Sequence, residues 1–547
     1  MRIGPSPHRC RLTFGGVRRL GLSLLSAAAL FGIVRPVGAQ QWLTDANQRI
    51  EQHRKADLTV NVVDSLGQAV PGADVHVEMK RHTFGFGTAV PAAWINNTSA
   101  NGVTFREKLL ENFNQVVFEN DLKYPPWIGL WGPGFNWPQT QQALDWLDAN
   151  VLPTRGHYLS WATWSGNDAW GTSQNVATLP QRIFDHISDK LPTVGTRVFE
   201  WDVINHPVGW LNDTYENRVE AAGLYAEGLE FYAEIIQHAR EIISRPVEQG
   251  GLGGANMPLW INEDDVIAGN SRANDYERII DYLIANDAAP DGIGFQGHFI
   301  QEWGRVTSSS PSQVYSRIDR FADKGVPLRA TEFDIDVGGD EAWQAQLMHD
   351  YLTVMFSHPA MEAITMWGFW QGTHWRPNAA LYRSDWSEKP ALAAYQDLVF
   401  NEWWTDSAGS ADELGEFLVR AFKGQYEITV NYNGVDYVVP LILNGDMSFD
   451  VTLPFSIGLP GDYNEDGQVD AADYIVWRKF DGTTTALPND NGLGGTVGTA
   501  HYNLWLANFG ATTGSGAGAV GAVPEPSSLL LLLICLTPLA LLRRIRT

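Results

Sequence analysis

A rhythm of short apolar strands alternating with amphipathic helices runs from residue 84 to residue 400, and it constrains the fold more than any other feature. Strands that alternate with helices form parallel sheets with helical crossovers. Helices are expected, for example, over Leu224–Ser244 and Asp275–Asn286. The eight strands that the pattern predicts are Phe84–Val90, Asn114–Glu119, Thr154–Trp161, Val198–Asn205, Pro258–Glu263, Gly292–His298, Pro327–Ile335 and Ala363–Trp370. Eight such units in about 315 residues predict an α/β fold of the (β/α)8 type, the TIM barrel.

Polar and aromatic residues collect at the carboxyl ends of these predicted strands. In a (β/α)8 barrel the active site lies at that end. A random scatter of core residues would not place its polar members so regularly. The residues concerned are Glu119, Asn120, His157, Asn205, His206, Asn262, Glu263, Gln296, His298, Glu332 and Trp367.

The charge balance limits the partners that this chain can have. The formal net charge is -25 over 547 residues, which argues against nucleic acid and against anionic membrane surfaces. A neutral polysaccharide is not repelled by such a surface. The 22 Trp and 17 Tyr residues fit a sugar ligand, because flat rings stack on sugar faces, although a large barrel also buries many aromatic residues.

Both ends of the chain carry addressing signals. Residues 1–39 combine an arginine-rich start, an apolar run and a small-residue cleavage site, which predicts a signal peptide and export. Residues 523–547 combine Val-Pro-Glu-Pro, an apolar run and a basic end, and they resemble the PEP-CTERM sorting signal of Gram-negative bacteria. That resemblance implies a membrane-spanning tail removed by a sorting transpeptidase at the cell surface, and a simple tail anchor is the alternative. The two cysteines, Cys10 and Cys535, fall in these segments, so the mature protein is expected to have no disulfide.

Two β-rich segments flank the barrel. Residues 41–83 and 404–456 are predicted β segments, in which residues 58–80 and 416–453 alternate in the manner of strands, and Asn433-Gly434 is a strong hairpin turn. We expect one small antiparallel β-domain assembled from both sides of the barrel. The sequence does not decide whether this domain binds glycan or braces the barrel.

Seven short motifs follow one another along residues 84–403. They are Phe86–Val90, Glu119–Lys123, Arg155–His157, Trp201–Asn205, Gly294–His298, Thr331–Ile335, and Trp367-Gly368 with Trp375-Arg376. One such motif is weak evidence, but seven in register are specific, and together they resemble the family 10 glycoside hydrolases, the xylanase family.

This resemblance implies a retaining hydrolase of a β-1,4-linked polysaccharide such as xylan, with no cofactor for catalysis. Retention requires two carboxyl groups about 5–5.5 Å apart. The resemblance implies that Glu332 is the nucleophile and that His298 and Asp334 hold it ionised and oriented. It also implies that Asn205 contacts the sugar 2-hydroxyl. The remaining substrate-binding residues that it implies are Glu119, Asn120, Lys123, His157, Gln296, Trp367 and Trp375.

Two positions depart from the family pattern. The acid/base glutamate should follow Asn205, but His206 and Pro207 stand there, and Ala162 replaces a histidine of the third strand. The first departure removes half of the catalytic pair.

Three hypotheses follow from His206. The imidazole itself serves as the acid/base, a role common for histidine. Alternatively, another carboxylate of the rim replaces the glutamate, or the barrel only binds glycan at the cell surface without cleaving it. The carboxylates at the predicted rim are Glu263, Asp264 and Glu302, while Glu200 is excluded because six residues along a strand span about 20 Å.

Residues 460–510 resemble a dockerin, a small calcium module. A calcium loop needs oxygen ligands at positions 1, 3, 5, 7, 9 and 12 and a glycine at position 6, which in this chain is Gly467. A helix is expected over Tyr474–Lys479. A second loop near Asp490–His501 is degenerate, so the sequence predicts one structural calcium ion. The predicted ligands are Asp462, Asn464, Asp466, the Gln468 carbonyl, Asp470 and Asp473.

The dockerin resemblance implies a cohesin-type partner. A spacer before the sorting tail is an equally good interpretation of the same segment. Residues 511–522, rich in glycine, alanine, threonine and serine, are predicted to be a flexible linker.

Overall fold

Eight parallel strands close into a barrel in the computed structural model, which describes residues 37–65, 67–163, 176–209, 213–455 and 458–512. Neighbouring strands are hydrogen-bonded in the order β11-β3-β4-β5-β6-β7-β8-β10, and β10 pairs with β11 to complete the ring. The predicted (β/α)8 architecture is therefore confirmed. The bounds are β3 Gly85–Val90, β4 Gln115–Phe118, β5 Thr154–Trp161, β6 Trp201–Asn205, β7 Leu259–Glu263, β8 Gly292–Phe295, β10 Leu328–Asp336 and β11 Met361–Met366.

The sixth predicted strand is in fact two strands. β8 ends at Phe295, and a separate β9 (His298–Ile300) pairs only with β10. Gly297 lies between them at φ +80°, a left-handed conformation that glycine adopts at little cost and that turns the chain. This break separates Gln296 from His298, so their side chains need not follow the alternation of one strand.

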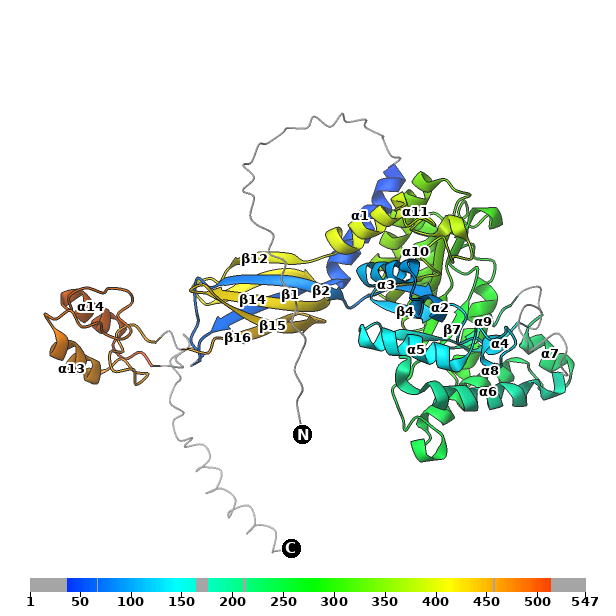
Figure 1. Ribbon diagram of the computed structural model, residues 1–547, viewed down its shortest axis with the longest axis horizontal. Helices are drawn as coiled ribbons and strands as arrows, with labels where there is room; N and C mark the ends of the chain where they lie inside the picture. Colours follow the sequence, from blue (N-terminus) through cyan, green and yellow to red (C-terminus); the bar gives the residue numbers. More distant parts are fainter. Residues whose placement is uncertain (1–36, 66, 164–175, 210–212, 456–457, 513–547) are drawn as a thin grey trace, which may run out of the picture. The chain divides into compact units, whose positions relative to one another are not determined.

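Helices fill the connections between the barrel strands (Figure 1). Both helices that were named as predictions are present, but their first residues differ from the prediction: α8 begins at Leu229 and α9 begins at Ala273. The longer helices are α3 Ala100–Asn112, α5 Trp137–Ala149, α6 Leu179–Val194, α8 Leu229–Ser244, α9 Ala273–Ala285, α10 Pro311–Ala322, α11 Glu341–Ser357 and α12 Pro390–Asp397. The shorter ones are α2 Ala92–Ile95, α4 Tyr124–Trp127 and α7 Tyr215–Ala221, and the single turns are η1 Val176–Thr178, η2 Gly195–Arg197, η3 Val247–Gln249, η4 Gln301–Trp303, η5 Pro377–Ala379 and η6 Leu398–Glu402.

Two tryptophans pack closely against the barrel strands because glycines on neighbouring strands make room for them. A Cβ atom on Gly156 would lie 2.3 Å from the Trp201 side chain, and one on Gly292 would lie 2.4 Å from Trp260. Both tryptophans are almost fully buried. Larger residues at these glycines would push the strands apart, so the barrel interior is a packed core rather than a channel.

The flanking segments form two sheets. One has the strand order β13-β1-β16 and the other β12-β2-β14-β15. The expectation of an antiparallel domain is wrong for one pair, because β1 and β16 run parallel. The predicted hairpin at Asn433 (φ +53°) and Gly434 (φ +81°) is confirmed. The strands are β1 Lys55–Val63, β2 Asp74–His82, β12 Asp406–Ser410, β13 Glu416–Phe422, β14 Gly424–Tyr432, β15 Val435–Leu443 and β16 Met447–Thr452.

Residues 41–53 are helical, which corrects their assignment to a β segment. They belong to α1 (Val37–His53). Trp42, Ala46 and Ile50 recur every four residues, which is the helical period, and Ala46 and Ile50 are buried.

Residues 458–512 hold two helices, α13 (Ala471–Phe480) and α14 (Thr499–Asn508), each preceded by a loop. Tyr463, Leu487 and Val497 form a small core of their own. α13 begins before the predicted Tyr474, because Asp470 caps it and its side chain accepts the Ala472 N–H.

The two terminal signals lie outside the described residues, apart from the short stretch 37–39 at the start of α1. This holds for the signal peptide 1–39, the tail 523–547 and most of the linker 511–522. Within the described ranges no helix is long and apolar enough to cross a membrane.

Candidate active site

Glu332 lies in β10 at the carboxyl end of the barrel, where two neighbours hold its carboxylate. Asn262 Nδ2 donates to Oε1 at 2.9 Å, and His298 Nε2 lies 3.4 Å from Oε2. Burial alone would raise the pKa of Glu332, but the contact with His298 outweighs burial and leaves this pKa below its usual value. Glu332 is therefore an ionised carboxylate at neutral pH, as a nucleophile must be.

His298 is held between two carboxylates. Its Nδ1 lies 3.0 Å from Asp334 Oδ1, and Trp375 Nε1 donates to the other Asp334 oxygen at 2.8 Å. Burial opposes a charge on His298, but Asp334 and Glu332 outweigh burial and raise its pKa to about 10. His298 is thus a cation that fixes both carboxylates, as expected from the family resemblance.

The residues that follow β4 lie on the other side of the site. Lys123 Nζ donates to Asn120 Oδ1 at 3.0 Å and lies 5.7 Å from the centre of the Trp367 ring. Burial raises the pKa of Glu119, and Lys123 opposes that shift only in part. The positions predicted from separate strands therefore lie close enough to interact electrostatically, since Lys123 also lowers the pKa of Glu332.

His157 is a buried donor with one nitrogen in use. Its Nδ1 contacts Asp202 Oδ2 at 2.8 Å, and Arg155 holds the other oxygen of Asp202 at 2.7 Å. Nε2 of His157 and Nδ2 of Asn205 are buried and have no hydrogen-bond partner among the residues that the structure describes. Buried polar atoms are almost always satisfied, so an unpaired donor, Asn205 Nδ2, and an unpaired ring nitrogen, His157 Nε2, indicate a place for ligand hydroxyl groups, which can both donate and accept.

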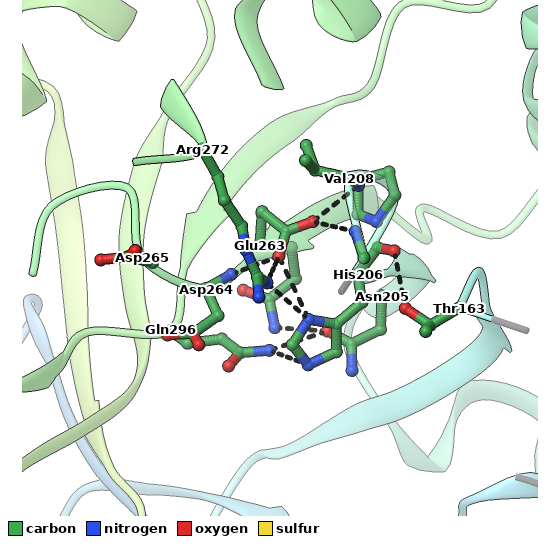
Figure 2. A network of polar contacts seen from close by, with 12 residues as sticks. Thr163, Asn205, His206, Val208, Glu263, Asp264, Asp265, Arg272 and Gln296 are labelled. Atoms are coloured by element: carbon green, nitrogen blue, oxygen red, sulfur yellow. Dashed lines mark hydrogen bonds and ion pairs between the residues drawn. The ribbon is translucent and has the colours of Figure 1, made fainter. Parts of the chain in front are cut away.

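His206 follows β6 in the place of the family glutamate and lies inside a polar network (Figure 2). Its Nδ1 is 3.1 Å from Glu263 Oε1, its Nε2 is 2.8 Å from Gln296 Nε2, and its ring lies 4.5 Å from that of Trp161. His206 has φ +56°, a left-handed conformation that is uncommon for a residue with a Cβ. Only 3% of its surface is exposed.

The carboxylates that could replace the missing glutamate are already engaged. Both oxygens of Asp264 accept from Arg305, at 2.7 and 2.8 Å, and this pairing overcomes burial and lowers the pKa of Asp264 to about 2. Glu302 pairs with Arg376 at 2.9 Å, and its side chain is 73% exposed. A general acid must hold a proton near neutral pH, so the ionised Asp264 is unsuited to the role, and Glu302 is turned toward solvent and Arg376.

Glu263 is excluded for the same reason. It accepts hydrogen bonds from Arg272 Nη1 at 2.7 Å and from the Val208 N–H at 2.7 Å, besides its contact with His206. Burial favours the neutral acid, but His206 and Arg272 outweigh burial and lower the pKa of Glu263. The structure therefore argues against the second hypothesis, a substitute carboxylate.

Arg272 and Trp303 support the site but were not predicted from the sequence, whereas Asn262 was predicted at a strand end without a role. Asn262 ties Glu332 to Asn205 Oδ1 at 2.9 Å, and Arg272 precedes α9 with no motif to mark it. Trp303 lies beside Trp375, with the ring centres 6.1 Å apart, and both residues are about 40% exposed. Only Asn262 had a usable signal, a polar residue directly after an apolar strand.

The predicted calcium ligands lie in the loop before α13. Asp462 accepts the N–H groups of Asp466 and Gly467, and Asp473 accepts those of Asn464 and Asp470. In the described part of the chain, no three His, Cys, Asp or Glu side chains group closely enough to hold a metal ion. The calcium site therefore stays a prediction from the sequence pattern.

The second loop repeats the first in a weaker form. Asp490 accepts the N–H groups of Gly492 and Gly494, and His501 occupies the place of Asp473, with its Nδ1 accepting the Gly498 N–H. This loop has glycines where the first has side-chain ligands, which agrees with its expected degeneracy.

Comparisons with known proteins agree with this geometry. The profile of the family described as Glycosyl hydrolase family 10 matches residues 76–398, more than half of the chain. The anti-sigma-I factor RsgI6 of Acetivibrio thermocellus is 27% identical over 405 residues, which cover 73% of this chain and 48% of that protein. Endo-1,4-beta-xylanase 1 of Arabidopsis thaliana is 24% identical over 399 residues, 72% of this chain and 38% of the xylanase. The chain thus spans about half or less of the length of these curated relatives.

Among solved structures, xylanase 10B of Thermotoga petrophila in complex with xylobiose is similar to 58% of this chain and 95% of that chain. The sequence identity is 20% and the TM-score is 0.48.

Proposed function

Because this chain belongs to glycosyl hydrolase family 10, we propose that its barrel cleaves a β-1,4-linked polysaccharide, with xylan as the first candidate. The observation that carries the proposal is the state of Glu332. It is buried, ionised and aligned by Asn262 and His298 at the end of the barrel where substrates bind. Such a carboxylate is equipped to attack an anomeric carbon and form a glycosyl-enzyme with net retention of configuration.

The sugar that Glu332 attacks would lie among polar donors and aromatic walls. Asn205 Nδ2 can donate to a sugar hydroxyl group, and His157 Nε2 can accept a hydrogen bond from one, because His157 Nδ1 holds the ring proton toward Asp202. Trp375 lies beside His298, and Trp367 lies beside Lys123. These contacts support a neutral sugar ligand, in keeping with the acidic charge of the whole chain.

The proton for the leaving group would come from His206. The side chains of Glu263, Asp264 and Glu302 are each held by other partners. His206 is therefore the titratable group that stands in the position of the family acid/base. General acid–base catalysis typically raises the rate about 10²- to 10⁴-fold. The leaving group of xylan is not activated, so the rate on xylan depends on how well His206 donates its proton.

A trapping experiment tests the role of Glu332 independently of any acid. The full chain is incubated with the 2,4-dinitrophenyl glycoside of 2-deoxy-2-fluoroxylobiose, whose leaving group needs no proton, and the adduct is located by mass spectrometry. We expect labelling at Glu332, none in Glu332→Gln, and unchanged labelling in the control Glu107→Gln, an exposed residue of α3. Labelling elsewhere, or none in the parent, would refute the proposed nucleophile.

A second candidate function is glycan binding without cleavage at the cell surface. The observation that favours it is the replacement of the family acid/base by His206, a ring that is only 3% exposed. In this case xylan oligosaccharides bind the parent and Glu332→Gln alike in calorimetry, and the fluoroglycoside leaves no adduct.

We propose further that the protein is exported and sorted to the cell surface, on the strength of the two terminal signals in the sequence. Its dockerin-like module is proposed to bind one calcium ion through the loop Asp462–Asp473 and to engage a cohesin-type partner. Mass spectrometry of the mature chain from a bacterium with a PEP-CTERM sorting system, and calcium titration of the full chain, test these two proposals.

A further inference from the structure

The two ring nitrogens of His206 face different chemistry. Nδ1 lies 3.1 Å from a carboxylate oxygen of Glu263, and Arg272 Nη1 is 3.5 Å away. Nε2 lies 2.8 Å from the amide nitrogen of Gln296 (Figure 2). A neutral imidazole carries its single proton on one of these two nitrogens, so their neighbours decide which one.

Glu263 cannot turn away from His206. Its Oε2 accepts the Val208 N–H at 2.7 Å, and its Oε1 accepts the Asp264 N–H at 2.8 Å and Arg272 Nη1 at 2.7 Å. The side chain is fully buried. A fixed, ionised carboxylate oxygen is only an acceptor, so the His206 nitrogen that faces it must carry a hydrogen.

The orientation of the Gln296 amide depends on whether the other ring nitrogen, His206 Nε2, carries a proton. Its amide N–H groups point at His206 Nε2 and at Asn205 Oδ1, 3.4 Å away. An amide N–H can donate only to an Nε2 that carries no proton. When Nε2 is protonated, the Gln296 amide must turn over and present its oxygen, so its orientation and the proton on Nε2 change together.

We propose that Glu263 and Arg272 are positioning residues that keep a proton on His206 Nδ1, leaving Nε2 as the atom that exchanges protons with substrate and water. This inference rests on the proposed function and extends it to residues outside the family motifs. In the first step Nε2–H protonates the glycosidic oxygen as the C1–O bond breaks and the Glu332–C1 bond forms. In the second, Nε2 takes a proton from water as the water oxygen bonds to C1 and the Glu332–C1 bond breaks.

The charges around His206 suit both steps. Among the described groups that face the ring are Glu263 at the end of β7, Arg272 before α9, and the neutral side chains of Gln296 and Trp161. The anion and the cation next to Nδ1 are paired with each other at 2.7 Å. The carboxylate can only accept, so it determines which ring nitrogen holds the proton.

The test compares Glu263→Gln and Arg272→Met with Arg240→Met, a control at an exposed ion pair of α8. We expect kcat/KM for aryl xylobiosides with poor leaving groups to fall about 10- to 100-fold in both test variants, within the range of acid–base effects. The dinitrophenyl substrate should retain its rate of enzyme glycosylation, because its departure needs no proton. The control should match the parent with both kinds of substrate.

A second readout does not depend on turnover. In the full chain labelled with 15N-histidine, the His206 signals, identified by their loss in His206→Asn, should show Nδ1 protonated across the pH range in the parent. In Glu263→Gln, the form with the proton on Nε2 should appear. If Glu263→Gln fails to fold, Arg272→Met carries the same comparison.

Two failures are distinguishable. If the fluoroglycoside does not label Glu332 in the parent, the proposed function fails. If Glu332 is labelled, but the test variants keep the parent dependence on leaving group and the parent histidine signals, then only the role of Glu263 and Arg272 is overturned.

Discussion

The pair formed by Asp264 and Arg305 gives the sharpest stability prediction. Arg305→Met keeps the length of the side chain but removes the guanidinium that binds both oxygens of Asp264. Asp264 is 3% exposed, so the substitution leaves a carboxylate stranded in the protein interior. Arg305 also lies 3.3 Å from Asp265 and 3.4 Å from the carbonyl of His298, so the loops after β7 and at β9 both lose a contact.

Two independent arguments give the expected loss in the free energy of unfolding. The pKa of Asp264 falls from 3.8 to about 2, and at 1.36 kcal/mol per unit this corresponds to about 2.5 kcal/mol of stability. Removing one partner of a buried ion pair typically costs about 3–5 kcal/mol. We therefore expect Arg305→Met to lower the free energy of unfolding by about 3 kcal/mol at pH 7.

The pH dependence follows from the sign of the shift. A lowered pKa contributes its stability above pH 3.8, and that stability is lost as the pH falls toward 2. The difference between parent and variant should be largest at neutral pH and should shrink in acid.

Urea denaturation of the full chain, followed by tryptophan fluorescence at pH 7 and pH 3, measures this difference. Arg376→Met, which breaks the exposed pair with Glu302, serves as the matched control and should cost less than about 1 kcal/mol. The double variant Asp264→Asn with Arg305→Met should recover much of the loss, since no charge is then stranded. A change below about 1 kcal/mol in Arg305→Met at pH 7 would show that Asp264 does not depend on Arg305.

Three further predictions concern the cleft and the C-terminal module. His298 has a pKa raised to about 10, so its contribution to stability is complete below pH 6.5 and is lost as the pH rises toward 10; thermal unfolding of His298→Gln against the parent should show this narrowing gap. Removing calcium with a chelator should lower the melting temperature of the C-terminal module in the parent but not in Asp473→Ala, and equal curves would contradict the calcium loop. Trp303→Ala should raise KM for long xylo-oligosaccharides about 2- to 10-fold through lost aromatic contact, with little change for an aryl xylobioside; an unchanged KM would remove Trp303 from the binding surface.

Much of the site could be predicted from the sequence because its members follow apolar strands in a fixed order. The period of the strands placed Glu332, His298 and Asn205 at the ends of different strands, and the barrel brings strand ends together; Lys123 came from the family resemblance alone. Arg272 could not be found in this way. It lies in a connection without periodicity, and only the closed barrel brings its guanidinium 2.7 Å from Glu263.

The flanking domain shows where strand patterns stop being informative. Alternation correctly identified the segments within Leu58–Lys80 and Glu416–Leu453 as strands. It gave no information on the direction of pairing, because β1 and β16 are separated by the entire barrel and meet in parallel, with Leu58 opposite Met447. For such long-range pairs, direction is set by the path of the intervening chain.

The reverse substitution, His206→Glu, brings these arguments together. A glutamate at position 206 would place a second carboxyl group beside the fixed carboxylate of Glu263, with Arg272 as the cation that contacts Glu263. Two carboxyl groups that share one cation in a buried site cannot both ionise readily, so one of them keeps its proton to higher pH. Because Glu263 is already held by Arg272 and two backbone N–H groups, the proton should stay on the introduced glutamate, where a general acid is needed.

Reducing-sugar release from xylan by the full chain measures this effect. If the parent cleaves and His206→Glu cleaves faster on an acid-shifted pH profile, His206 is a weaker acid/base in a working site. If the parent is silent and His206→Glu cleaves, the barrel has retained Glu332 and its sugar contacts as a binding site. If His206→Glu folds and is labelled at Glu332 but fails to cleave, the surroundings of Glu263 do not support an acid at position 206, and the expected division of the proton between the two carboxyl groups is wrong.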